Sequence, residues 1–279
     1  MHKKMNILGI EMDCLSYEDM YPIFDKWLSD KTAPSHSLAL VNVNCCVSTL
    51  FDPSLRGIYN SADIKGIDSM PFLKWARTFY YKESDRFYAP DLMLEIGSKA
   101  SAKGYTFFLY GGTLEAPDKM EAYLKEQVGY IEIVGKYSPP FRPLSEEEDQ
   151  MVCDMINATQ PDFLWIGLGS PKQDIWIHEH REKIRGSIII ASGATFDFFS
   201  GRINQAPKTI RNLGLEWLFR LIQDFRRLWV RYTVYNIIFI FLFILQNLQI
   251  VRFNAVPSVE SAGLQNEGEM IESDNGILE

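Results

Sequence analysis

The 279-residue sequence predicts an α/β fold, in which helices cover a Rossmann-like parallel sheet and a basic and apolar helical appendage follows at the C-terminus. Three observations support this prediction. Short β-branched and aromatic runs alternate with helical patterns of ten or more residues, as in parallel sheets with crossover helices. Glycine turns follow several of these runs. A basic segment then leads directly into a stretch without charge.

The expected elements alternate along the chain. The sequence opens as β-α-β, with an apolar run at Asn6–Ile10, a helical pattern at Tyr17–Leu28 and an alternating run at Ser37–Asn44. A helical segment over Cys45–Ser61 and a short strand over Ala62–Asp68 follow. The later elements are expected to be helices Pro71–Phe79 and Pro90–Lys103, strand Tyr105–Tyr110, helix Leu114–Gln127, strand Ile131–Val134, a helix opened by the Ser145 and Glu148 capping box, strand Phe163–Leu168, helix Pro171–Ile184 and strand Ser187–Ala191.

Composition divides the chain into three parts. Residues 1–205 form the expected α/β domain, 206–252 the helical appendage, and 253–279 an acidic, disordered tail. The tail has six acidic residues, no Lys or Arg and few large apolar residues. Because it carries most of the net charge of −8, the remaining chain is nearly neutral, and we expect no nucleic-acid partner.

Cysteine usage and the N-terminus both indicate a cytoplasmic body. The four cysteines form no C-x-x-C pair and no metal-ligand spacing, which favours reduced, structural thiols. His178 and His180 point to different faces of the expected helix, so no metal site is predicted. The apolar run within Met1–Asp13 is too short for a secretory signal.

Polar side chains follow two of the expected strands. Asn42 and Asn44 project to the same side at a strand's carboxyl end, where open α/β sheets bind ligands, although turn-forming asparagines give the same pattern. Asp68 ends the next strand, just before the helix-start residues Ser69 and Pro71. Its carboxylate is expected either to cap that helix or to act as a general base, and spacing does not separate the two.

The segment Gly167–Asp174 combines a glycine turn with a helix start. Ser170 stands at the expected N-cap and Pro171 at the first helical position, with Lys172 and Gln173 in the first turn. Free backbone amides, a helix N-terminus and a lysine together suit a phosphate or a sugar hydroxyl group. An ordinary helix start with incidental polar residues remains the alternative.

Common nucleotide signatures are missing. The Gly111-Gly112 turn is not a G-x-G-x-x-G and has no P-loop lysine after it, so no nicotinamide or ATP cofactor is predicted. No Asp-x-Asp pair occurs to hold a metal on a sugar nucleotide. An enzyme of that kind would then neutralise its leaving group with arginines and helix dipoles, and the segment Ala191–Tyr232 carries an excess of such cations.

Taken together, these stretches resemble the WecG/TagA/CpsF family of bacterial glycosyltransferases, glycosyltransferase family 26. The resemblance covers nearly all of residues 5–232. It rests on motifs in a fixed order: Asn42-Val43-Asn44, Ala62-Asp63 through Asp68-Ser69-Met70-Pro71, Arg86 with Pro90-Asp91-Leu92, Gly167 through Gln173, Phe196-Asp197 with Gly201 and Ala206-Pro207, and Gly214 through Leu221 with Arg226-Arg227.

The resemblance implies an inverting reaction without a required metal. Members transfer a hexose-type residue from a UDP-sugar to a lipid-linked acceptor, commonly undecaprenyl diphosphate carrying N-acetylglucosamine. Asp68 would be the general base, with Ser69 standing where the family usually has glycine. The implied substrate contacts are pocket lining by Asn42 and Asn44, donor or acceptor binding by Lys172 and Gln173, and diphosphate neutralisation by Arg86, Arg220, Arg226 and Arg227.

The stretch Thr233–Val251 is uncharged and lies between Arg231 and Arg252. As a helix it would reach about 28 Å, marginally enough to cross a bilayer. Its Asn and Gln residues fall within an arc of about 160°, which gives one weakly polar face and favours an interfacial or shallowly inserted helix. A single span with the tail outside would also obey the positive-inside rule, and a buried core helix is the third alternative.

The sequence therefore predicts a transferase at the cytoplasmic face of the plasma membrane, attached peripherally or by one C-terminal membrane helix. It would move a hexose-type sugar, such as N-acetylmannosamine, its uronate or glucose, from a UDP-sugar to a polyprenyl-diphosphate-linked acceptor in surface polysaccharide, exopolysaccharide or teichoic acid synthesis. The alternatives are a sugar-nucleotide-modifying enzyme of the 2-epimerase type and a non-catalytic membrane scaffold. A homo-oligomer that completes the site is left open.

Overall fold

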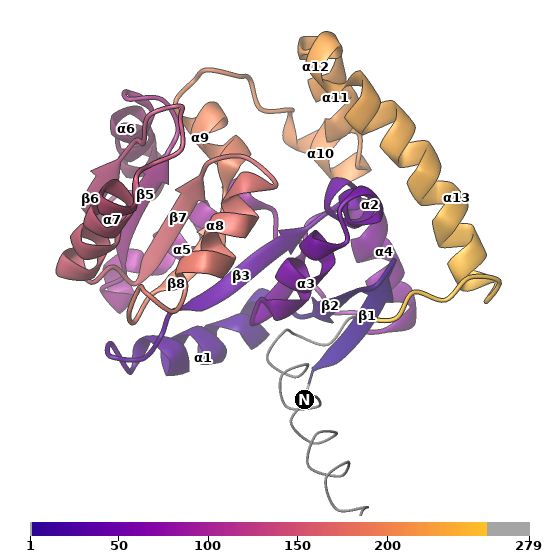
Figure 1. Cartoon of the computed structure of the whole chain (residues 1–279), viewed down its shortest axis with the longest axis horizontal. Coiled ribbons are helices and arrows are strands. Elements are labelled where there is room, and N and C mark those ends of the chain that lie inside the picture. Colours follow the sequence, from indigo (N-terminus) through magenta and orange to yellow (C-terminus); the bar gives the residue numbers. More distant parts are fainter. Residues whose placement is uncertain (1, 256–279) are drawn as a thin grey trace, which may run out of the picture.

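A six-stranded parallel sheet forms the centre of the computed structural model, which describes residues 2–255 without the side chain of Arg227 (Figure 1). The sheet confirms the predicted α/β, Rossmann-like fold. Its strand order is β4-β3-β8-β7-β5-β6. The strands are β3 (His36–Val41), β4 (Ile64–Ile67), β5 (Thr106–Gly111), β6 (Glu132–Tyr137), β7 (Phe163–Gly167) and β8 (Ile188–Ala191).

Helices cover both faces of the sheet because its strands are apolar on both sides. In β7, Phe163 and Trp165 point into one buried cluster, whereas Leu164 and Ile166 point into another. The first face is covered by α1 (Tyr17–Leu28), α5 (Ala89–Lys103), α6 (Ala116–Val128) and α9 (Gly193–Phe199). The second face is covered by α2 (Val43–Phe51), α3 (Ser54–Ser61), α7 (Glu146–Thr159) and α8 (Lys172–His180).

The strands β3 and β8 lie side by side, but the chain leaves them toward opposite faces of the sheet. After β3 it enters α2, and after β8 it enters α9. Such a topological switch opens a crevice at the carboxyl ends of the two strands. Asn42, Asp68 and Ser192 each directly follow a strand that ends at this edge.

The N-terminal prediction needs one correction, because the chain opens with an antiparallel hairpin instead of one strand of the sheet. Strands β1 (Lys3–Ile7) and β2 (Ile10–Cys14) pair with each other alone. The apolar run Asn6–Ile10 spans the hairpin turn, where Leu8 and Gly9 both have positive φ, of 50° and 89°. A two-residue turn of this kind joins twisted antiparallel strands, and the apolar character of Leu8 concealed it in the sequence.

The expected helix over Cys45–Ser61 is also divided. It consists of α2 and α3, which are separated at Asp52 and Pro53. Proline disfavours a helical conformation in the residue before it, and Asp52 accordingly ends α2 in an extended conformation. The following helix, α4 (Met70–Phe79), and the capping box of α7 agree with the predicted elements.

The C-terminal appendage contains α10 (Lys208–Leu213), α11 (Glu216–Gln223), α12 (Phe225–Trp229), a π-helical turn at Val230–Val234 and α13 (Tyr235–Asn247). One side of α13 packs on the body, where Phe239 contacts Phe72 and Phe243 contacts Trp75 at ring-centroid distances of 5.3 and 5.1 Å. At its end, the Gln246 side chain accepts a hydrogen bond from the backbone of Leu8 in the hairpin turn.

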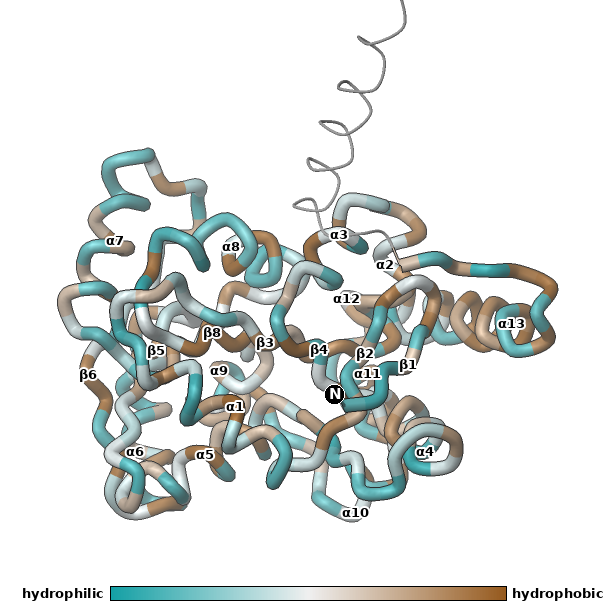
Figure 2. Tube along the Cα trace, turned by 90° about the horizontal axis from the view of Figure 1, so that it is seen from below, coloured by the Kyte–Doolittle hydropathy of each residue, from teal (hydrophilic) through white to brown (hydrophobic). Residues whose placement is uncertain are grey.

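The opposite side of α13 is apolar and exposed. Figure 2 shows the hydrophobic colour of residues along this helix. Among the described residues, Val230–Asn247 is long and apolar enough to cross a membrane by length and composition, and only 6% of it is buried. The predicted tail lies outside the described residues from residue 256 onward.

Candidate active site

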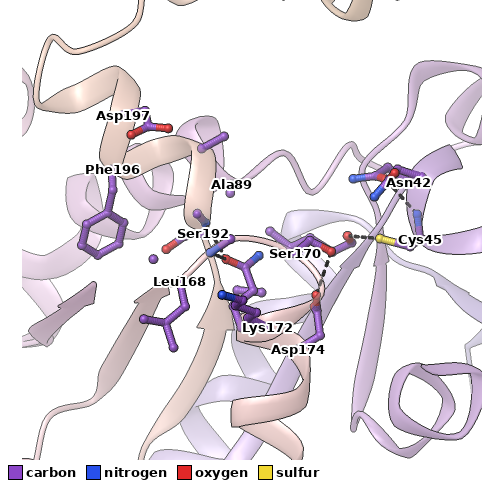
Figure 3. Close-up of a pocket in the computed structure, with 18 of the residues that line it drawn as sticks. Asn42, Cys45, Ala89, Leu168, Ser170, Lys172, Asp174, Ser192, Phe196 and Asp197 are labelled. Carbon is purple, nitrogen blue, oxygen red and sulfur yellow. Dashed lines mark hydrogen bonds between the residues drawn. The ribbon is translucent and has the colours of Figure 1, made fainter. Parts of the chain in front are cut away.

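A cleft of about 1930 Å³ opens at the carboxyl ends of the parallel strands. Its walls come from the segments that follow β3, β4, β7 and β8, and from α11 and α13 of the appendage. Figure 3 shows Ser170, Lys172 and Asp174 at the start of α8 opposite Asn42 and Cys45, with Phe196 and Asp197 of α9 farther along. The appendage therefore contributes to the same cleft as the sheet.

Asp68 lies between β4 and α4 and lines this cleft. It does not cap α4, because Ser69 occupies the N-cap position and its hydroxyl accepts a hydrogen bond from the Val43 amide at 3.2 Å. One carboxylate oxygen, Oδ2, accepts a hydrogen bond from Asn42, whereas the buried Oδ1 has no hydrogen-bond partner among the residues that the structure describes. The geometry thus favours the alternative in which this carboxylate is available to accept a proton.

Asn42 explains how Asp68 is held. Its Oδ1 accepts the Cys45 amide at 3.2 Å and caps α2, while its Nδ2 donates to Asp68 Oδ2 at 3.1 Å. Asn42 therefore both caps a helix and supports the Asp68 carboxylate. The two sequence interpretations of this residue, a turn-forming asparagine and a residue of the binding edge, are compatible. Asn44 also lines the cleft, and its buried Oδ1 has no hydrogen-bond partner within the described part of the chain.

Burial dominates the electrostatics of Asp68. The pKa of Asp68 is raised to about 6. Loss of water on burial raises it most, the Arg86 guanidinium lowers it, and the nearby Glu216 carboxylate raises it. A carboxyl group with a pKa near the working pH is suited to accept a proton during a reaction and to release it afterwards. A carboxyl group with a strongly shifted pKa that lines a cleft is a candidate functional residue.

Arg86 links Asp68 to the appendage. Its Nη2 lies 3.6 Å from Asp68 Oδ1 and 3.3 Å from Glu216 Oε2, and its Nε donates to the Asp68 backbone carbonyl. The guanidinium also stacks over the Tyr88 ring, with Cζ 4.4 Å from the ring centroid. Arg86 therefore contacts protein groups on several sides, and its contact with a diphosphate stays a prediction.

The start of α8 differs from the predicted helix start. The helix begins at Lys172, and Ser170 donates its hydroxyl hydrogen to Asp174 at 3.0 Å instead of capping the backbone. Gln173 is buried, and its Oε1 accepts from the amides of Gly169 and Gly193 at 3.1 and 3.0 Å. Gln173 thus joins the two loops that follow β7 and β8, which gives it a structural role beside the predicted substrate contact.

Three cations of the cleft have no carboxylate within ion-pair distance in the described part of the chain. Lys172 is exposed at the start of α8, while Arg220 and Arg231 come from the appendage. The Arg220 guanidinium is held by aromatic faces, with Cζ 5.6 Å from the Phe198 ring centroid and 5.9 Å from that of Tyr232. These cations remain available for an anionic substrate.

One of the predicted arginines does not line the cleft. Arg226 is exposed and does not line it, and the side chain of Arg227 lies outside what the structure describes. Arg231 lines the cleft instead, one helical turn farther along the chain.

Sequence reasoning assigned no role to Asp174, Tyr88 or Glu216. Burial raises the pKa of Asp174 to about 6, while Ser170 and Tyr59 donate hydrogen bonds to it and lower the pKa. In the sequence, Asp174 has the position of an ordinary acidic residue in the first turn of a helix, so no pattern indicated its burial. In the sequence, Glu216 is one of two acidic residues in a basic segment. Only the fold shows that it faces Arg86.

The side chains of Asp149, Cys153 and His180 bring three potential metal-ligand atoms within 4.8 Å of one another. His180 Nδ1 faces the Trp176 carbonyl at 2.7 Å, and its Nε2 faces the Asp149 carboxylate at 2.8 Å. These contacts explain the arrangement as a hydrogen-bonded pair between buried His180 and half-buried Asp149, next to the buried Cys153 thiol. The sequence did not indicate it, since Cys153 and His180 lie on different helices.

The model of the glycosyl transferase WecG/TagA/CpsF family matches residues 5–252 of this chain. The match covers the sheet, the cleft and the appendage, including α13. The chain therefore belongs to this glycosyltransferase family, as its motifs suggested.

Proposed function

We propose that this protein is an inverting, metal-independent transferase that moves a hexose-type sugar from a UDP-sugar to a polyprenyl-diphosphate-linked sugar. It acts in the synthesis of a surface polysaccharide, exopolysaccharide or teichoic acid at the cytoplasmic face of the plasma membrane. A glycosyltransferase needs a donor, an acceptor and a means of activating the acceptor hydroxyl group. Membership of the family supports the reaction type, and the cleft supports the assignment of roles.

The observation that carries the proposal is the environment of the Asp68 carboxylate. Its buried Oδ1 accepts no hydrogen bond from the described residues and lies 3.6 Å from Arg86 Nη2, and the pKa of Asp68 is raised to about 6. The carboxylate takes the proton of the acceptor hydroxyl group as that oxygen attacks the anomeric carbon from the face opposite the leaving UDP. One base is enough for an inverting displacement, and such assistance supplies roughly 10²- to 10⁴-fold in rate.

The leaving diphosphate is neutralised by side chains in this proposal. Lys172, Arg220 and Arg231 line the cleft without a carboxylate partner among the described residues. Cations fixed in a site of limited water access stabilise developing negative charge more strongly than mobile ions in solution. The sequence contains no Asp-x-Asp pair, which supports a reaction that proceeds through arginine and lysine alone.

The test is acceptor-dependent release of UDP, measured over a panel of UDP-hexoses with a short-chain prenyl-diphosphate N-acetylglucosamine acceptor, in detergent and with EDTA. We expect one donor to give release that requires the acceptor and is unchanged by the chelator. Release that stops with EDTA would contradict the metal-independent mechanism. Conversion of the donor without an acceptor would instead indicate a sugar-nucleotide-modifying enzyme.

The exposed side of α13 is proposed to lie in the membrane interface. Ile237, Ile240, Phe241 and Ile244 are more than half exposed, while Phe239 packs on the body. Because Gln246 and Phe253 form hydrogen bonds with the hairpin, a helix crossing the bilayer alone would have to break these contacts. An interfacial helix keeps them and brings the cleft to a lipid-linked acceptor.

Ile244→Asp is therefore expected to lower binding to anionic lipid vesicles by at least tenfold, because a charge replaces buried apolar area at the interface. Co-sedimentation with vesicles measures the change. Leu114→Asp is the matched control, since Leu114 is 85% exposed but lies between β5 and α6, elements on the side of the molecule opposite α13 (Figure 1). Equal losses in both variants, or no loss in either, would contradict the placement of α13.

A further inference from the structure

Glu216 is an acidic residue of the appendage that is buried beside the carboxylate of Asp68. It is the first residue of α11, and its side chain is only 11% exposed. Buried carboxylates are costly unless they are paired and hydrogen-bonded, so its position requires an explanation. Its two oxygens contact two different groups of the body, Tyr88 and Arg86.

The guanidinium of Arg86 is shared between two carboxylates. Its Nη2 lies 3.3 Å from Glu216 Oε2 and 3.6 Å from Asp68 Oδ1. The Nε bond to the Asp68 carbonyl and the stacking over Tyr88 hold the guanidinium plane in place. Since one terminal nitrogen serves both partners, a stronger pairing with one carboxylate weakens the pairing with the other.

Glu216 is itself fixed by a hydrogen-bond chain. The Tyr88 hydroxyl donates to Glu216 Oε1 at 2.7 Å, and Gln205 donates to the Tyr88 oxygen at 3.2 Å. Tyr88 is buried, so its bond to Glu216 is shielded from solvent. Gln205 and Glu216 lie in the segment after the sheet, whereas Tyr88 lies in the body. These hydrogen bonds therefore form only while the appendage is docked on the body.

We propose that Glu216 is a positioning residue for the transfer reaction: it holds Arg86 back from Asp68 and so preserves the strength of the base while α11 is docked. The inference rests on the proposed role of Asp68. The electrostatics agree with it, because Arg86 lowers the pKa of Asp68 and Glu216 raises it. Loss of the Glu216 charge would leave Arg86 to Asp68 alone and make the base weaker.

The first measurement is the pH dependence of kcat for Glu216→Gln. We expect its acidic limb to move down by about one pH unit, because a buried like charge on the same guanidinium raises a carboxyl pKa by that order. The plateau is expected to fall roughly three- to tenfold, since a weaker base accepts the proton less readily. Glu126→Gln, an exposed residue on α6, is the control and should leave both features unchanged.

The second measurement is a carbon NMR titration of the Asp68 carboxyl group, with the signal assigned by its loss in Asp68→Asn. The midpoint should fall in Glu216→Gln and fall by less in Glu216→Asp, which keeps the charge but withdraws it from Arg86. The smaller fall in Glu216→Asp remains measurable if the Gln variant folds poorly, and a loss of packing alone would not produce it.

The two hypotheses fail in different ways. If Asp68→Asn is inactive but the titration midpoint of Asp68 is unchanged in both Glu216 variants, the role of Glu216 is overturned. The assignment of Asp68 as the base then still stands. An active Asp68→Asn would overturn the base assignment, and the role of Glu216 in catalysis with it. A fall in midpoint accompanied by a matching fall in the acidic limb supports the inference.

Discussion

Asp68→Asn is expected to lower kcat by roughly 10²- to 10⁴-fold while leaving KM for the UDP-sugar within a few-fold. The amide fits the same space between Asn42 and Arg86 but cannot accept a proton. In the unsubstituted protein, kcat should rise with pH through about 6, because the pKa of Asp68 is raised to about 6 and only the ionised form acts as a base. The measurement is UDP release over pH 5–8.

Asp174→Asn is the matched comparison. Burial raises its pKa to about 6 as well, and it lines the same cleft. Its Oδ2 already accepts hydrogen bonds from Ser170 and Tyr59, so we expect it to support the loop and to cost far less activity than Asp68. A larger loss in Asp174→Asn than in Asp68→Asn would move the base to α8.

The stability of Asp68→Asn distinguishes a loss of catalysis from misfolding of this variant. Because the folded protein holds the Asp68 proton more tightly than the unfolded chain does, the ionised carboxylate costs folding free energy above pH 6. This cost disappears as the pH falls from 6 toward 4. At pH 7, Asp68→Asn is therefore expected to be more stable than the unsubstituted protein, by about 1–3 kcal/mol, in denaturant unfolding.

The sheet could be predicted from the sequence because its strands are buried on both faces. Runs such as Phe163–Gly167 and Ile188–Ala191 are apolar throughout and are bounded by turn residues. The hairpin could not be predicted in the same way. Its turn uses Leu8 at positive φ, which no local pattern signals, and its apolar residues continue across the turn.

The part of the site next to the strand ends was also accessible from the sequence. Asn42 and Asp68 follow strands directly, and the rule that parallel sheets bind ligands at their carboxyl edge places them together. Tyr88 and Glu216 are 128 residues apart and meet only through the docking of α11, so spacing carries no information about their contact. Motif resemblance suggested Arg86, Arg220, Arg226 and Arg227 as candidates but did not indicate which of them line the cleft.

Arg220→Gln is expected to lower kcat by about 10²-fold, or roughly 2.7 kcal/mol in the activation free energy. Arg220 lines the cleft, rests on the rings of Phe198 and Tyr232, and has no carboxylate partner among the described residues. Its charge therefore remains available as the UDP diphosphate leaves. Glutamine keeps much of the side-chain length and some hydrogen bonding, so the lost charge should dominate the effect on UDP release.

Arg226→Gln is the control from the same basic segment. Its side chain is exposed and does not line the cleft, so kcat with a short-chain acceptor in detergent should stay within about twofold of the unsubstituted value. Binding to anionic vesicles should weaken instead, since each arginine near such a surface contributes about 1 kcal/mol. Equal losses of kcat in the two variants would mean that α12 turns toward the cleft when substrates bind, because only then would Arg226 reach the diphosphate.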